Sequence, residues 1–143
     1  MSTPYESATL LIRLYELRRD PTMREARAWY ARSFNPTSVD DMVQALTGPN
    51  SAHFRMVTSY WEMAASFVNH TAIDEEMFAE ANGEHIVCFA KVEPFLAEYR
   101  TKMGMPMFLS SLEKLLANAP GMKERLASTR ERFRALAATA TTR

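Results

Sequence analysis

Two of the three histidines, His53 and His85, have the positions in this sequence best suited to holding a metal ion or a haem. Each is expected on the apolar side of a helix near its start, in the segments 51–70 and 84–102. Neither forms a Glu-x-x-His or His-x-x-x-His pair, and no inward-facing carboxylate lies within one helical turn of either. We therefore predict hydrogen-bonded histidines of the core and no metal site.

The single cysteine, Cys88, lies among Ile86, Val87 and Phe89. One cysteine excludes an internal disulfide framework and a multi-cysteine zinc site. Because its neighbours are apolar, we predict a buried thiol that is held in its unreactive, protonated form.

The loop Met103–Met107 carries three methionines at alternate positions, a pattern that can hold Cu(I). The ten methionines are spread along the whole chain, which favours a gap-filling role and predicts no copper site here. In the acidic segment 74–84, Asp74, Glu75 and Glu76 are explained by helix capping and the helix dipole, and the cluster as a whole is expected to be a solvated face that could attract a basic partner. The sequence also lacks a phosphate loop, a nucleophile elbow and a dinucleotide fingerprint, so we assign no catalytic residue and no cofactor and disfavour an enzyme.

Charge is unevenly distributed along the chain, although its 17 basic and 17 acidic residues cancel. Residues 1–38 have a net charge of +2, residues 39–99 of −8 and residues 100–143 of +6. Two explanations stay open: the segments compensate one another within the fold, or oppositely charged faces guide self-association. A nucleic-acid partner is not expected, because the acidic middle repels phosphates and glutamates are interleaved with the terminal arginines.

Composition and the N-terminal stretch both indicate a globular protein. Apolar residues make up 47% of the 143 residues, enough to form one ordinary core. The N-terminus has no positively charged start, and Arg13 and Glu16 interrupt its apolar run. We therefore expect neither a signal peptide nor direct membrane insertion, and predict a cytoplasmic protein.

Helix start and stop signals, such as Thr3-Pro4 and Asp20-Pro21, recur along the sequence, and no strand-period run is present. We predict an all-α, single-domain bundle of about seven or eight amphipathic helices over residues 1–143, with a frayed tail at 136–143. The expected helices are 4–19, 21–34, 39–46, 51–70, 74–82, 84–102 with a kink or break at Pro94, 108–116 and 122–136.

The apolar spacing within these helices predicts which of their faces are buried. The helix 51–70 is expected at the centre, with Phe54, Val57, Tyr60, Trp61, Ala64, Phe67 and Val68 on one broad face. In the helix 4–19 the spacing predicts a buried face made of Ala8, Leu11, Leu14 and Tyr15. The first half of 84–102 has two apolar faces, which places it at the centre of the fold or at a subunit interface.

Three segments of the chain together resemble a known family. They are Tyr60–Ala65, Ala72–Phe78 and Phe89–Leu96, which contain an aromatic-Glu helix, an Ile-Asp-Glu short helix and a Lys-x-x-Pro kinked helix. In this order they resemble a bacterial family of small all-helical domains of unknown function, over roughly residues 50–100. Many relatives carry a membrane-spanning segment ahead of the domain, which is not expected here. The resemblance implies the helical fold and no catalytic residues.

Two functions are compatible with these observations. The first is a non-enzymatic interaction or assembly module, self-associating as a homodimer or binding a protein partner that the sequence does not identify. The alternative is a small-molecule or cofactor binder with a pocket between helices 51–70 and 84–102. Aromatic rings with a few polar tips are typical of such pockets. Its candidate ligand-binding residues are His53, Tyr60, Trp61, His85 and Tyr99.

Overall fold

The first two helices begin where the sequence signals a helix start. The Thr3 hydroxyl accepts a hydrogen bond from the Glu6 amide, and the Glu6 carboxylate accepts one from the Thr3 amide. This is the predicted capping box, and it opens helix α1 (Pro4–Arg18). Asp20 caps helix α2 (Pro21–Arg32) through its side chain, and both helices carry proline at the start of their first turn.

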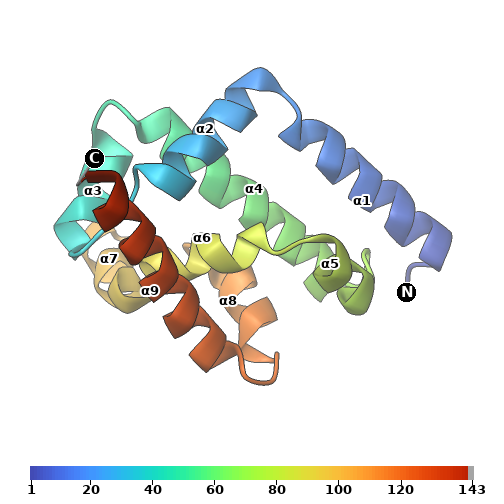
Figure 1. Cartoon of the computed structure of the whole chain (residues 1–143). Coiled ribbons are helices and arrows are strands. Elements are labelled where there is room, and N and C mark those ends of the chain that lie inside the picture. Colours follow the sequence, from blue (N-terminus) through green and yellow to red (C-terminus); the bar gives the residue numbers. More distant parts are fainter. Residues whose placement is uncertain (142–143) are drawn as a thin grey trace.

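The computed structural model describes residues 1–141, and every secondary-structure element in this part of the chain is a helix, which confirms the predicted fold class (Figure 1). After α1 and α2 come α3 (Val39–Thr47), α4 (Ser51–Asn69), α5 (Glu75–Ala81), α6 (Glu84–Val92), the 3-10 turn η1 (Glu93–Phe95), α7 (Leu96–Met103), α8 (Ser110–Ala117) and α9 (Met122–Thr141). Helix α9 includes residues 136–141 of the segment predicted to fray, and residues 142 and 143 lie outside the described residues, so the fraying stays a prediction.

Pro94 divides the helix predicted over 84–102. Proline has no amide hydrogen, and its ring clashes with the preceding turn of an α-helix. The backbone responds with the 3-10 turn η1, which joins α6 directly to α7. Counting α6, η1 and α7 as one kinked element gives eight helices in the described part of the chain, within the predicted number.

Helix α4 runs through the middle of the molecule (Figure 1). Helices α2 and α8 pack along it, and α9 lies across α6. The expected central face of α4 is buried: Phe54, Trp61 and Ala64 are each at most 1% exposed. Burial of such large apolar side chains is the main source of stability in a domain of this size.

Two charged side chains cap helix ends far away in the sequence. The carboxylate of Glu62 on α4 accepts hydrogen bonds from the amides of Ser111 and Leu112, in the first turn of α8. These amides have no partner within their own helix, and a negative charge is favourable at a helix N-terminus. Glu62 therefore ties α8 to the central helix.

Lys91 on α6 is buried and caps the C-terminus of α2. Its Nζ donates to the carbonyl oxygens of Tyr30, Ala31 and Phe34 at 2.8, 3.0 and 2.8 Å, and to Asn35 Oδ1 at 3.2 Å. The last carbonyls of a helix lack donors of their own helix and favour a cation. Burial lowers the pKa of Lys91 to about 8, so the side chain is mostly charged at neutral pH.

The acidic middle of the chain is paired with its basic ends inside the fold. Glu84 pairs with Arg18 and Arg27 of the N-terminal segment. Two further ion pairs join the middle to the C-terminal segment, Lys102 with Asp40 and Arg130 with Glu93. These contacts support compensation within the fold, the first of the two explanations for the charge distribution.

No helix within residues 1–141 combines the length and the apolar character needed to cross a bilayer.

Candidate functional site

Three of the five candidate ligand-binding residues lie together at the contact of α4 with α6. The ring centroids of Tyr60 and Trp61 are 4.8 Å apart, and those of Trp61 and His85 are 5.7 Å apart. Phe78 of α5 closes this cluster at 4.9 Å from the His85 ring. Trp61 is 1% and His85 4% exposed, so their rings fill the interior here.

The other two candidates, His53 and Tyr99, have different neighbours. The His53 ring lies 6.0 Å from that of Trp29, and its Nε2 is 4.0 Å from a carboxylate oxygen of Glu25. The Tyr99 ring packs 4.9 Å from Phe108. The structure thus assembles Tyr60, Trp61 and His85 but does not bring all five residues into one cluster.

Two ionisable side chains of this interior, His85 and Cys88, are held in their neutral forms. Burial, with a smaller contribution from the charge of Arg125, lowers the pKa of His85 to about 4, so its imidazole is neutral at pH 7. Burial also raises the pKa of Cys88 to about 12, which confirms the predicted buried thiol. In the part of the chain that the structure describes, no three His, Cys, Asp or Glu side chains are grouped so as to hold a metal ion.

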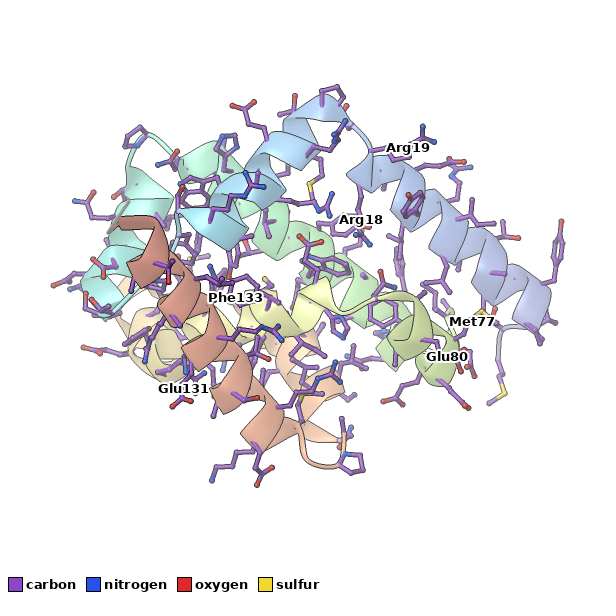
Figure 2. All side chains as sticks on the ribbon, in the orientation of Figure 1. Arg18, Arg19, Met77, Glu80, Glu131 and Phe133 are labelled. Atoms are coloured by element: carbon purple, nitrogen blue, oxygen red, sulfur yellow. The ribbon has the colours of Figure 1, made fainter. Side chains whose placement is uncertain are left out.

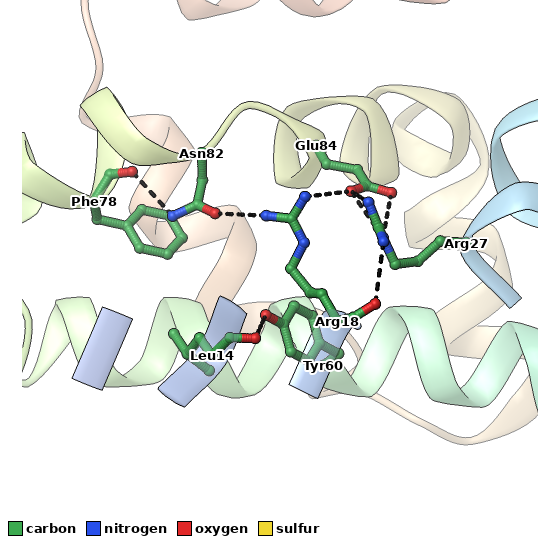
Figure 3. A network of polar contacts seen from close by, with 7 residues as sticks. All are labelled: Leu14, Arg18, Arg27, Tyr60, Phe78, Asn82 and Glu84. Carbon is green, nitrogen blue, oxygen red and sulfur yellow. Dashed lines mark hydrogen bonds and ion pairs between the residues drawn. The ribbon is translucent and has the colours of Figure 1, made fainter. Parts of the chain in front are cut away.

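A polar network joins α1 to α2 and α6 beside this cluster (Figure 3). The Glu84 carboxylate accepts hydrogen bonds from Nε and Nη2 of Arg27, the latter at 2.9 Å, and lies 3.5 Å from Arg18 Nη2. Arg18 Nη1 donates to the side-chain oxygen of Asn82 at 3.1 Å. The side chains of Arg18, Arg27 and Glu84 are only 19–26% exposed, so these contacts are less screened by solvent than surface ion pairs.

Further hydrogen bonds hold the inner face of α1 along its length. The hydroxyl of Tyr60 donates to the carbonyl oxygen of Leu14 at 2.6 Å. Near the start of the helix, the Asp74 amide donates to the buried hydroxyl of Ser7 at 3.0 Å. Because α1 is fixed at its beginning, middle and end, it has a defined rotation about its own axis.

Another side of α1 carries an exposed apolar stripe. We call Tyr5, Ala8, Ile12 and Tyr15 the outer face of α1. Tyr5 is 81%, Ile12 59% and Tyr15 58% exposed, and Ala8 is partly exposed. Figure 1 shows α1 along one edge of the molecule, and Figure 2 shows Arg18 turned towards the body while its neighbour Arg19 points away.

This orientation corrects one expectation from the sequence. Ala8 and Tyr15 are predicted to be buried, but the buried residues of α1 are Ser7 and Leu14. Helix α1 carries apolar side chains around most of its circumference, so periodicity did not determine which side packs inwards. The hydrogen bonds to Ser7 and to the Leu14 carbonyl turn that side towards α4 and α5 and leave Tyr15 outside.

The chain is thus an all-helical domain that holds one helix firmly along its edge, with an apolar face outward. It belongs to the family described as "Domain of unknown function (DUF4760)", whose model matches residues 5–119. The resemblance to an uncharacterised helical family is confirmed. No curated protein and no solved structure matches the chain.

The structure also gives a physical role to the three segments on which the resemblance rested. Glu62 of the first caps α8, and Asp74 of the second caps α5. Lys91 of the third caps α2. Each of these three charged residues satisfies backbone groups at a helix end. Sequence reasoning missed this for Glu62 and Lys91 because their partners are about 50 to 60 residues away.

We expect Tyr60→Phe to lower the free energy of unfolding by about 1 kcal/mol, because it removes the hydrogen bond to the Leu14 carbonyl. Amide hydrogen exchange in α1 should become faster in this variant. Tyr99→Phe is the matched control: the Tyr99 hydroxyl is buried and has no hydrogen-bond partner within residues 1–141, so its removal should be neutral or stabilising. Equal effects of the two substitutions in urea unfolding would contradict this assignment.

Proposed function

We propose that this protein is a helical interaction module and that the outer face of α1 is its docking surface. One observation carries the proposal: Tyr5, Ile12 and Tyr15 are each more than half exposed on a single side of one helix. Isolated apolar side chains on a surface are ordinary, but a contiguous apolar stripe is typical of a protein-binding site. Two tyrosines strengthen the case, because aromatic residues are enriched at interfaces.

The way α1 is held supports the same function. A docking helix binds more tightly when it is already folded and correctly rotated, since less conformational entropy is then lost on binding. The capping box at Thr3 and the contacts of Ser7, Leu14 and Arg18 provide this preorganisation. We propose that the outer face of α1 binds another helix through its regularly spaced apolar side chains.

The alternative function, binding of a small molecule or cofactor between α4 and α6, has one observation in its favour. Nε1 of Trp61 and Nδ1 of His85 are buried and have no hydrogen-bond partner among the described residues. A ligand bound there would have to separate two rings whose centroids are 5.7 Å apart. We therefore place this function second.

Site-specific photo-cross-linking in cells tests the docking surface. A benzophenone amino acid in place of Tyr5 should give a discrete cross-linked band, because Tyr5 is in the proposed interface. The same group in place of exposed Glu131 on α9 is the control and should give none (Figure 2). Adding Ile12→Glu to the Tyr5 cross-linker should remove the band, since a carboxylate would then be buried in an apolar contact. Absence of any band from position 5 would overturn the proposal.

A further inference from the structure

We infer that the partner of the outer face is a second copy of this chain, whose α1 packs antiparallel to the first. This inference rests on the proposed function and names the occupant of its docking surface. It is carried by the spacing of the outer face and by the sizes of its side chains.

The spacing of the outer face is that of a helix–helix seam. Tyr5, Ala8, Ile12 and Tyr15 are separated by three, four and three residues. Apolar residues alternating at these intervals occupy the a and d positions of a heptad, which face a partner helix. Positions 5, 8, 12 and 15 are also symmetric about position 10. A twofold axis at the level of residue 10 therefore sets the outer face of one copy against the outer face of the other, with the two helices running in opposite directions.

This symmetry pairs large side chains with suitable neighbours. In the antiparallel arrangement Ala8 of one copy lies opposite Ile12 of the other, so the branched side chain has a small residue to pack against. Tyr5 lies opposite Tyr15, which places two aromatic rings within reach of each other at each end of the seam. Both contacts occur twice, as a twofold interface requires.

The sizes of the side chains also favour the antiparallel direction. Parallel packing in register would set Ala8 against Ala8 and Ile12 against Ile12, so the layer at Ala8 would be underfilled. Glu6 and Arg13 occupy b positions of this heptad, which face away from the partner helix and leave the seam itself free of charge.

The size of the seam limits its strength. Helix α1 has 15 residues and is therefore about 22 Å long. A single helix pair of this length buries less surface than a standard stable interface of about 1,600 Å². The dimer should accordingly be reversible, forming at micromolar or higher concentrations.

Sedimentation velocity over a hundredfold range of concentration measures the dimer of the full chain. Ile12→Glu should weaken it at least about tenfold. Arg13→Glu is the matched control and should leave the association nearly unchanged, because position 13 faces away from the seam although the charge also becomes more negative. Equal association of the wild type and Ile12→Glu would overturn the inference.

Cysteine cross-linking tests the direction, and buried Cys88 leaves the introduced thiol as the accessible one. Thr9 lies one residue from the twofold axis, so Thr9→Cys should form a disulfide-linked dimer. Tyr5→Cys should not, because two antiparallel copies hold position 5 at opposite ends of the seam. A dimer linked through position 5 and not through position 9 would overturn the antiparallel arrangement.

The two proposals fail in different ways. A strict monomer in sedimentation, together with a photo-cross-linked band at position 5 whose mass differs from that of two chains, would overturn the second-copy inference and retain the docking surface. A monomer with no cross-linked band would overturn both.

Discussion

Lys91→Met should lower the free energy of unfolding by about 3 kcal/mol, a large fraction of the stability of an ordinary domain. The substitution keeps the aliphatic stem and removes the ammonium that caps α2. Three backbone carbonyls and the side-chain oxygen of Asn35 then lose their charged donor in a buried setting. Each buried acceptor left without a partner costs about 1–3 kcal/mol, partly offset because the ammonium no longer has to be desolvated.

Urea unfolding measures this effect as a shift of the midpoint at constant slope. Lys102→Met is the matched control, because the Lys102 side chain is half exposed and pairs only at the surface, with Asp40. Because solvent screens an exposed pair, its removal should leave the midpoint nearly unchanged. If Lys91→Met were no more destabilising than Lys102→Met, the capping role of Lys91 would be wrong.

Acidification should destabilise the protein through His85 by an amount on the order of 3 kcal/mol between neutral pH and pH 4. Burial lowers the pKa of His85 to about 4 in the folded state, whereas an imidazole in the unfolded chain titrates near 6.5. Between these two values the unfolded chain binds a proton that the folded protein does not. Stability due to this group is therefore complete above about pH 6.5 and is lost as the pH falls towards 4.

The substitution His85→Phe isolates this contribution. A phenyl ring retains the packing against Trp61 and Phe78 and cannot be protonated. Because carboxylates also titrate in this range, the readout is the difference between the wild-type and variant stability profiles, measured by urea unfolding at several pH values. The variant should lose on the order of 3 kcal/mol less than the wild type. His70→Phe removes an exposed histidine as the control, and parallel profiles for wild type and His85→Phe would refute the prediction.

Both residues belong to the framework that positions α1. Lys91 joins α6 to the end of α2, and His85 lies on α6 beside Trp61. On the same helix, Glu84 pairs with Arg18 of α1. Loss of either interior contact should therefore also loosen α1, so the stability measurements bear on the proposed docking surface.

Local sequence information was sufficient for the elements of this fold. The caps at Thr3, Asp20 and Asp74 act on amides two or three residues away, so the sequence displays both partners. The central face of α4 was equally predictable, because Phe54 and Trp61 belong to one continuous apolar face. The buried state of Cys88 followed from its apolar neighbours in the same way.

The candidate site was only partly predictable, because it combines residues from different helices. Helical spacing brought Tyr60 and Trp61 together and placed His85 on the inner side of its helix, where the structure finds them in one cluster. It did not show that His53 and Tyr99 lie with other partners, because that depends on how two helices cross. Spacing within one helix carries no information on the crossing between two.

By itself, then, the sequence determined the helical class of the protein, most of its helix starts and the residues of its central helix. Only the tertiary structure decided the partners of Lys91 and Glu62 and the direction in which α1 faces. These partners and this orientation depend on contacts between residues far apart in the chain. For α1, apolar side chains on more than one side permitted several rotations, and the hydrogen bonds to Ser7 and Leu14 selected the one that leaves Tyr5, Ile12 and Tyr15 at the surface.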